Sequence, residues 1–196
     1  AIPALRALQS EGHKVTLVVT QPDRPSGRGR KLQMPPVKIE ANTLNIPVFQ
    51  PESFKNSDSV QTLVEASPDL IVVAAYGIIL PKKVLEIPTL GTLNIHPSLL
   101  PRWRGPSPIQ SAILAGDGST GISIIFLNEE MDAGPILSRQ EVVIAPSETT
   151  GELEKRLAEI GALALIKCVD EFRNGIPIAY PQDEKKATFC QLISKQ

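Results

Sequence analysis

The chain of 196 residues has little of several features on which whole classes of protein depend. Its two cysteines, Cys168 and Cys190, have no metal-binding or redox spacing, which excludes a disulfide scaffold and makes a reducing compartment, the cytoplasm, the expected location. No stretch approaches the roughly 18 apolar residues that a membrane span needs, and no signal peptide is visible. We therefore expect a protein that does not enter a membrane.

The chain also lacks a large net charge of either sign, because 20 Lys and Arg against 21 Asp and Glu leave a net charge of -1. This balance excludes a strongly basic nucleic-acid module but allows a local basic patch. Apolar residues make up 42%, and a chain of this length can bury a stable core without the help of disulfides or metal ions. Proline is in excess, since 18 of 196 residues are about 9% against a usual ~5%.

Strand-like and helical segments alternate along most of the chain. Runs rich in β-branched residues at 15–19 and 70–75 predict strands buried on both faces. Further strands are expected at 47–49, 91–96, 121–126 and 136–144, the last one paired with its predecessor, and helices at 1–10, 37–44, 60–65, 109–114 and from a capping box at Thr149 and Glu152 to about 174. The pattern predicts an α/β fold, Rossmann-like, with a mostly parallel open sheet and helices on both faces.

Two further expectations concern the ends of this arrangement. Such sheets normally open with a strand, whereas this chain opens with a helix, so we expect the first strand to precede Ala1. One domain is expected over residues 1–176. Residues 177–196 are polar and weakly patterned, and we expect them to be a linker or tail toward a further domain.

The predicted strand at 91–96 ends with Asn94 and His96, which lie two residues apart and therefore face the same side. In open α/β sheets, ligands bind beyond the carboxyl ends of the strands. Two interpretations stay open at this point. The amide and imidazole are either satisfied by loop backbone or used for chemistry.

Three loops could complete a site around this strand end. Residues 97–108 carry four prolines and two arginines around Trp103, which predicts a stiff loop, either a rigid connector or a ligand platform. Asp132 is followed by small residues, a pattern far more often a tight turn than a site when it stands alone. Gly77 follows the strand at 70–75, where a glycine allows a ligand close to the backbone but also suits an ordinary connection.

Residues 21–38 form a basic segment. Its five basic residues and one acidic residue, Asp23, give it a net charge of +4 within 18 residues. The basic residues are Arg24, Arg28, Arg30, Lys31 and Lys38. A solvated surface loop and a basic finger for nucleic acid or polyphosphate are both compatible with this composition. The Gly-x-Gly at 27–29 is a poor dinucleotide fingerprint, since the third glycine is absent and no helix follows at once.

Taken together, residues 94–105 and 131–134 resemble the folate-dependent formyltransferases, whose signature is an Asn-x-His strand end, a Ser-Leu-Leu-Pro loop and a later Asp. Residues 21–32 are similar to an insertion typical of the members that act on charged initiator tRNA. The resemblance covers essentially the whole chain as a catalytic domain, without the family's first strand and its C-terminal β-barrel domain.

The resemblance implies transfer of a formyl group from 10-formyltetrahydrofolate to the α-amine of methionyl initiator tRNA, with no metal and no membrane; we expect a monomer. It implies Asn94, His96 and Asp132 as catalytic residues. Folate contacts are carried over onto Ser98, Leu99, Leu100 and Pro101 and onto Tyr76, Gly77, Ile78, Ile79 and Leu80. Contacts to tRNA are carried over onto Arg24, Arg28, Arg30 and Lys31.

Three alternatives remain. The first is another formyltransferase, acting on a glycinamide nucleotide or an amino sugar, although a small amine substrate needs no long basic finger. The second is a folate-dependent hydrolase with water as acceptor. The third is a non-catalytic folate- or RNA-binding module, against which the intact Asn94, His96 and Asp132 argue.

Overall fold

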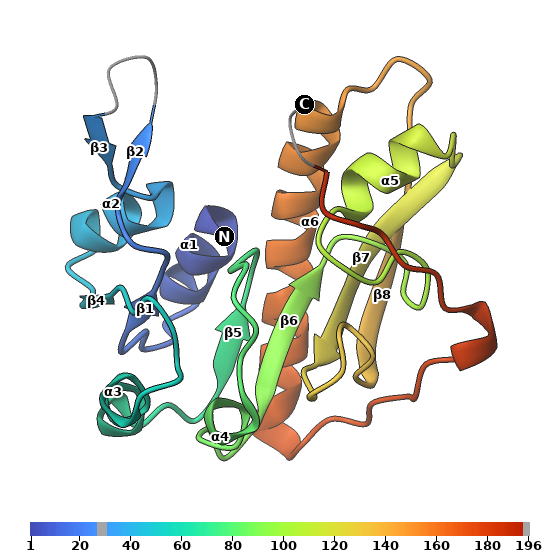
Figure 1. The fold of residues 1–196 in the computed structure, drawn as a ribbon. Coiled ribbons are helices and arrows are strands. Elements are labelled where there is room, and N and C mark those ends of the chain that lie inside the picture. The colour runs from blue at the N-terminus through green and yellow to red at the C-terminus, as the bar shows by residue number, and fades with distance from the viewer. Residues whose placement is uncertain (27–30, 194–196) are drawn as a thin grey trace.

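The computed structural model describes residues 1–26 and 31–193 (Figure 1). Its helices are α1 (Ile2–Ser10), α2 (Pro36–Thr43), α3 (Ser57–Ala66), α4 (Lys82–Leu85), α5 (Pro108–Leu114) and α6 (Thr150–Glu171), with 3-10 turns at Phe172–Asn174 and Glu184–Lys186. Its strands are β1 (Val18–Val19), β2 (Arg24–Ser26), β3 (Lys31–Gln33), β4 (Val48–Phe49), β5 (Ile71–Val73), β6 (Thr92–His96), β7 (Ser119–Phe126) and β8 (Ile136–Val143).

The main sheet has the strand order β5-β6-β7-β8. Strands β5 and β6 are parallel, while β7 runs antiparallel to both β6 and β8. A second parallel pair, β1 and β4, and the antiparallel hairpin of β2 and β3 lie at the amino-terminal side of this sheet (Figure 1). The predicted α/β class is confirmed, and so is the predicted pairing of the last two strands.

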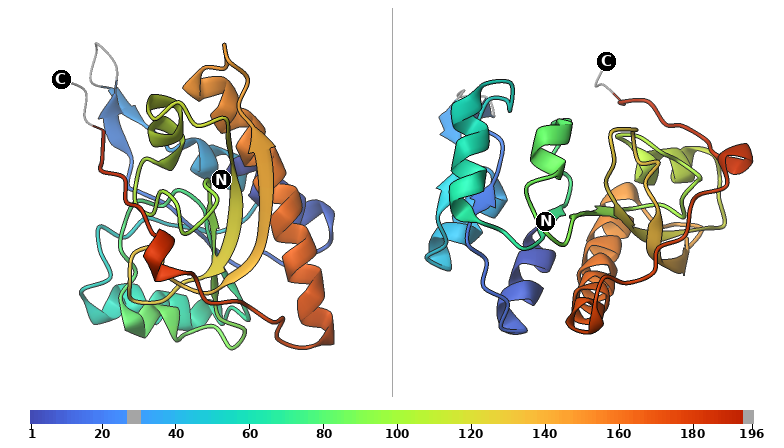
Figure 2. Two further views of the ribbon diagram at one scale, coloured as in Figure 1. Left: turned by 90° about the vertical axis from the view of Figure 1, so that its right-hand side faces the viewer. Right: turned by 90° about the horizontal axis from the view of Figure 1, so that it is seen from below.

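Helix α6 covers one face of the sheet. Its N-terminus is the expected capping box, in which the Thr149 side chain accepts from the backbone N–H of Glu152 and the Glu152 carboxylate accepts from that of Thr149. Leu153, Leu157 and Leu165 on its apolar side are almost fully buried against β6 and β7. Helix α1 packs beside α6 on this same face, while α3 and α4 lie on the opposite side (Figure 2).

Close contact between α6 and β6 fixes the strand that carries Asn94 and His96. A Cβ atom at Gly161 would lie 2.8 Å from Ile95 Cγ2 and 3.4 Å from Ile122 Cδ1, so the helix approaches the sheet where it has no side chain. Ile95 points to the helix, and the residues before and after it therefore face the other side.

The C-terminal segment packs back onto the domain. After α6 the chain turns and runs across the far end of β8 and then over the loops that follow β6 (Figures 1 and 2). Isolated bridges pair Tyr180 with Ile136 and Phe189 with Arg104. Within the described residues, no helix is long and apolar enough to cross a membrane.

Candidate active site

Three polar side chains converge at the carboxyl end of β6. The Asn94 amide nitrogen lies 3.3 Å from Asp132 Oδ1, and His96 Nδ1 lies 3.6 Å from the same oxygen. Asn94 and His96 are both buried, and Asp132 comes from the loop between β7 and β8. The prediction that Asn94 and His96 face the same side is confirmed, and the structure brings Asp132 to them.

The His96 imidazole is held by the backbone. Its Nε2 lies 2.9 Å from the Trp103 carbonyl oxygen, which can only accept, so Nε2 carries the proton and donates. Nδ1 is then the open nitrogen that faces Asp132. Burial lowers the pKa of His96 below its ordinary value, although the Asp132 charge and the Trp103 carbonyl oppose this shift. The imidazole is therefore neutral at neutral pH.

The turn at Asp132 is fixed by its surroundings. Asp132 has a φ of +50°, a left-handed conformation that aspartate tolerates better than most residues. Its Oδ2 accepts a hydrogen bond of 2.8 Å from the Gly105 backbone N–H. Gly134 lies against the Phe126 carbonyl, where any Cβ would clash. The small residues after Asp132 thus serve close backbone packing that places the carboxylate.

The Ser-Leu-Leu-Pro loop is itself part of the core. Ser98 and Leu100 are fully buried. The Ser98 hydroxyl donates to the Arg102 carbonyl at 2.6 Å, and the Ser123 hydroxyl on β7 bridges the Ser98 carbonyl and the Leu100 N–H. Pro101 is buried and Leu99 half-buried. These side chains therefore build the rigid loop behind the site, and their assignment to folate stays a prediction.

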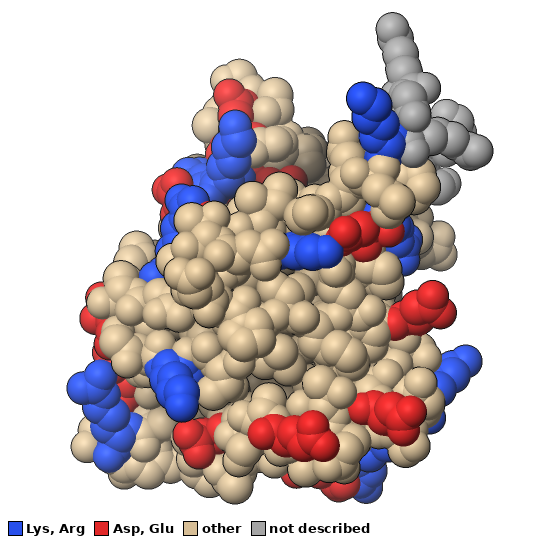
Figure 3. Space-filling model, turned by 90° about the vertical axis from the view of Figure 1, so that its left-hand side faces the viewer, with Lys and Arg blue, Asp and Glu red and all other residues tan. Residues whose placement is uncertain are grey.

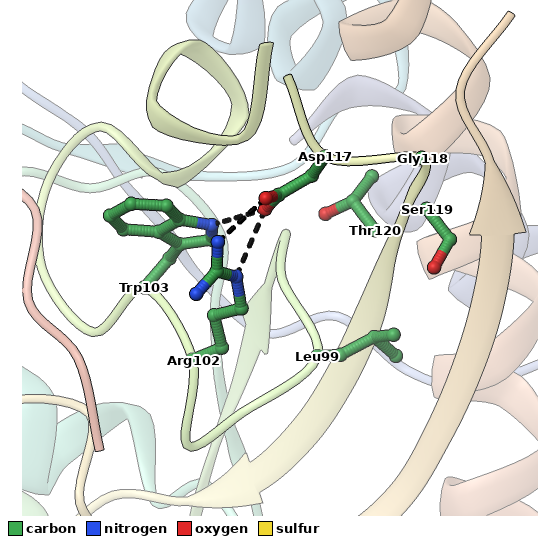
Figure 4. A pocket seen from close by; sticks show the side chains of 7 residues that line it. All are labelled: Leu99, Arg102, Trp103, Asp117, Gly118, Ser119 and Thr120. Carbon is green, nitrogen blue, oxygen red and sulfur yellow. Dashed lines mark hydrogen bonds and ion pairs between the residues drawn. The ribbon is translucent and has the colours of Figure 1, made fainter. Parts of the chain in front are cut away.

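A second polar cluster anchors the same loop (Figure 4). Asp117 accepts two hydrogen bonds from the Arg102 guanidinium, at 2.6 and 3.0 Å, and one of 2.8 Å from the Trp103 indole N–H. The guanidinium lies 4.4 Å from the Trp103 ring centroid. The pKa of Asp117 is lowered, mainly by Arg102. A cavity of about 270 Å³ opens beside this cluster and is also lined by Leu99 and Thr120.

The segment after β5 presents an exposed apolar rim. Gly77 has a φ of +76°, which favours glycine, and Ile79 is 80% exposed. Ile78 and Leu80 are half-buried. The Tyr76 ring packs on Phe54, and its backbone carbonyl accepts from the Gln21 side chain. An exposed isoleucine in the segment that follows β5 is compatible with a planar ligand but does not demonstrate one.

The basic segment contains a β-hairpin that rises from the same end of the molecule as the carboxyl ends of β5 and β6 (Figure 1). Lys38 is fixed at its base by Asp23, at 2.8 Å, and by Gln50. Arg24 and Lys31 are exposed on β2 and β3, and the Arg24 guanidinium donates to the Gln21 side chain. The predicted tRNA contacts Arg28 and Arg30 lie outside the described residues.

The amino-terminal side of the molecule carries separated groups of both charge signs among its described residues (Figure 3). The residues that the structure describes on this face form no continuous acidic or basic field, so attraction of a polyanion to this face would depend on the basic segment itself. The structure groups no three His, Cys, Asp or Glu side chains as a metal site in 1–26 or 31–193.

Sequence reasoning missed several groups that build the site. The Trp103 carbonyl and the Gly105 N–H are backbone atoms, which no motif of side chains identifies. Arg104 and Gln182 meet although 78 residues separate them. The unusual density of arginine and proline around Trp103 was the only signal in the sequence that this loop is rigid and makes many specific contacts.

Comparison with known proteins agrees with this geometry. Residues 2–169 match the family described as formyl transferase. The chain is 50% identical over its full length to methionyl-tRNA formyltransferase of Stenotrophomonas maltophilia (strain K279a), and 47% identical to that of Chloroflexus aurantiacus (strain ATCC 29366 / DSM 635 / J-10-fl). It spans 64% and 63% of the length of these two relatives.

Solved structures show the same fold. Phosphoribosylglycinamide formyltransferase from Bacillus halodurans superposes with a TM-score of 0.71 at 26% identity, over 89% of this chain and 93% of that one. A sugar 3N-formyl transferase, solved in the presence of dTDP and 5-N-formyl-THF, superposes with a TM-score of 0.70 at 16% identity, over 96% and 65% of the two chains. With a family match over most of its length and an asparagine, a histidine and an aspartate joined at one strand end, this chain belongs to the formyl transferase family.

Proposed function

We propose that this protein transfers a formyl group from 10-formyltetrahydrofolate to the α-amine of methionyl initiator tRNA. The observation that carries the proposal is the convergence of Asn94 and His96 on one oxygen of Asp132, in a chain half identical to methionyl-tRNA formyltransferases. The setting we propose is the cytoplasm, with the protein acting as a monomer.

Formyl transfer needs little base strength and much positioning. An α-amine titrates at ~7.7–8.0, and acylation of the neighbouring carboxyl group lowers this value, so a substantial fraction of the nucleophile is neutral at cellular pH. The site must hold this nitrogen against the formyl carbon and stabilise the oxyanion of the tetrahedral intermediate. It must then move one proton from the attacking nitrogen to the departing folate nitrogen.

We assign these tasks to three side chains. The Asn94 amide has a second N–H besides the one that faces Asp132, and it stabilises the oxyanion. His96 Nδ1, left open because Nε2 donates to Trp103, accepts the proton of the attacking amine and passes it to the folate nitrogen as the carbon–nitrogen bond breaks. Asp132 orients the imidazole and stabilises its charged form.

For the substrates, we assign the apolar rim after β5, including Gly77 and Ile79, to the folate side. We assign the loop at residues 98–101 to the same side, with its buried Ser98 and Leu100 side chains holding the loop in place. The hairpin residues Arg24 and Lys31, together with Arg28 and Arg30 of the same segment, are assigned to the tRNA. The support for this assignment is the position of the hairpin at the same end of the molecule as the site (Figure 1). Lys38 is excluded from this role because Asp23 and Gln50 occupy its ammonium group.

A formyl-transfer assay with the full-length protein tests the proposal. Charged initiator tRNA and glycinamide ribonucleotide are compared as acceptors, with 10-formyltetrahydrofolate as donor. The second acceptor matters because the phosphoribosylglycinamide enzyme from Bacillus halodurans shares the fold at 26% identity. Transfer to tRNA and none to the ribonucleotide is expected. Hydrolysis of the donor without either acceptor would favour the hydrolase instead.

A further inference from the structure

Residues 180–190, which we call the C-terminal strap, contact both loops that form the candidate active site. The strap begins with a bridge to β8, in which Ile136 and Tyr180 exchange backbone hydrogen bonds of 2.8 and 2.9 Å. It ends beside residue 104, where Arg104 N–H donates to Thr188 and Cys190 N–H donates to Arg104. Between these two attachments it crosses the loops (Figures 1 and 2).

Gln182 lies between the attachments and uses every group of its amide. Its nitrogen donates to the Asp132 carbonyl at 2.7 Å and to the Gly134 carbonyl at 2.8 Å. Its oxygen accepts from two nitrogens of the Arg104 guanidinium, at 3.0 and 2.9 Å. One side chain therefore joins the turn that carries the candidate catalytic carboxylate to the loop that follows β6.

Arg104 explains why an amide is needed at this position. Its side chain is only 3% exposed, and a buried guanidinium must have its donors satisfied. Glu184 supplies two of the acceptors, at 2.7 and 2.9 Å, but is itself 65% exposed. An acceptor toward Arg104 and a donor toward two carbonyls are both required, and glutamine provides both.

The strap also reaches the histidine. The Thr188 hydroxyl accepts a hydrogen bond of 2.9 Å from the backbone N–H of Trp103, and the Trp103 backbone carbonyl in turn accepts from His96 Nε2. Trp103 has a φ of +61°, a conformation that a tryptophan keeps only where its surroundings hold it. Gly105, whose N–H binds Asp132, would place a Cβ only 2.5 Å from the Cys190 carbonyl.

We propose that Gln182 is a positioning residue for the candidate active site. It holds Asp132 in place by donating to the backbone carbonyls of the Asp132 turn, and it accepts hydrogen bonds from the buried Arg104 guanidinium. Gln182 lies beyond residue 169, where the family match ends, so the site is completed by a segment outside the matched region. The consequence for catalysis rests on the proposed function, whereas the placement of Asp132 does not.

Gln182→Met tests the inference, because methionine keeps the length of the side chain and removes the amide. In the full-length protein we expect kcat for formyl transfer to fall about ten- to a hundredfold, the range for a slightly misplaced catalytic group, with KM for the folate changed less than about twofold. Gln140→Met on β8 is the matched control, since Gln140 is exposed and outside the site. It should leave both constants unchanged.

A second measurement separates positioning from function. The Gly105 amide proton donates to Asp132 Oδ2, so its hydrogen exchange reports where the carboxylate is, whatever the protein catalyses. Gln182→Met should accelerate this exchange at least about tenfold, with the buried Ile124 amide unaffected. Gln182→Glu, which keeps acceptors for Arg104 but cannot donate to the two carbonyls, should accelerate it as well.

Unchanged exchange at Gly105 in both variants would overturn the inference, as would a kcat that falls only in step with the folded fraction. An inactive parent protein whose variants nonetheless show faster exchange at Gly105 would instead count against the proposed function alone.

Discussion

At the scale of single residues, the candidate site consists of Asp132 and of two side chains, Asn94 and His96, that both face its Oδ1 atom. Asn94→Ala, His96→Ala and Asp132→Ala are each expected to lower kcat by at least about a hundredfold, because each removes a group that acts mainly in the transition state. Steady-state kinetics with circular dichroism as a folding control measures this. A double variant should lose far less than the product of the single losses, and near-normal turnover of any single variant would remove that residue from the site.

His96 predicts a pH dependence of stability. Burial lowers the pKa of the folded imidazole below the ~6.5 of the unfolded chain. Between these two values the unfolded state binds more protons, so the free energy of unfolding falls as the pH drops through this window, by at most about 1.4 kcal/mol per pH unit. Urea unfolding at several pH values between 5 and 7.5 should show a shallower dependence for His96→Asn than for the parent. Equal slopes in the two proteins would contradict a buried, neutral His96.

The same pKa shift governs catalysis. An unprotonated Nδ1 is required to accept the amine proton, and this condition is met above about pH 6.5. Any decline of kcat/KM above that pH should therefore follow protonation of the substrate α-amine, and the contribution of His96 should appear only below about pH 6.5. Asn94 and His96 could be identified from the sequence because a spacing of two fixes their common side on a strand. The proton on Nε2 could not be foreseen, since it follows from a backbone carbonyl of Trp103, whose direction depends on the folded loop.

At the scale of elements, strands and helices followed from local patterns. The β-branched runs, the capping box at Thr149 and the alternation of β6 are local features, and each produced an element near its expected place. The strap illustrates what local patterns omit. Residues 180–190 have no hydrophobic periodicity, and they are ordered by backbone bonds to Ile136 and Arg104 that are distant in sequence.

Helix α6 allows a sharp test of element packing. Gly161→Ala adds a methyl group 2.8 Å from Ile95 Cγ2, and the χ1 angle of isoleucine is too stiff for easy relief. Overpacking costs about 1–3 kcal/mol, which exceeds the ~0.5–1 kcal/mol gained from replacing a helical glycine. We expect net destabilisation, measured by denaturant unfolding. The control is Gly151→Ala in the same helix, which meets no atom within 4 Å and should be neutral or stabilising.

If Gly161→Ala were more stable than the parent, α6 would not press on β6 as described. In the expected case the variant has a second use. Because Ile95 lies between Asn94 and His96, a shifted β6 should also lower kcat. Ile95→Leu, which lacks the Cγ2 methyl group that makes the contact and keeps the side-chain volume, should restore part of both losses.

At the scale of the whole molecule, the hairpin of β2 and β3 and the candidate active site share one end of the sheet (Figure 1). A tRNA acceptor end that reaches Asp132 could therefore contact the hairpin as well. The surface view of the amino-terminal side shows charges of both signs on the described residues, so specific contacts must contribute to any binding of tRNA at this face (Figure 3).

The final prediction compares two basic residues of the same segment. Arg28→Ala should weaken transition-state binding of charged tRNA by about 1–3 kcal/mol, the range for a specific arginine contact, and should leave folate affinity unchanged. Lys31, exposed on β3, is the matched control for a plain phosphate contact. Lys31→Ala should lower tRNA affinity mildly and reduce the salt dependence by about one unit of slope. Formylation rates over a series of salt concentrations distinguish the two. If Arg28→Ala formylates tRNA like the parent at every salt concentration, the segment is only a solvated surface, and a small amine becomes the better acceptor.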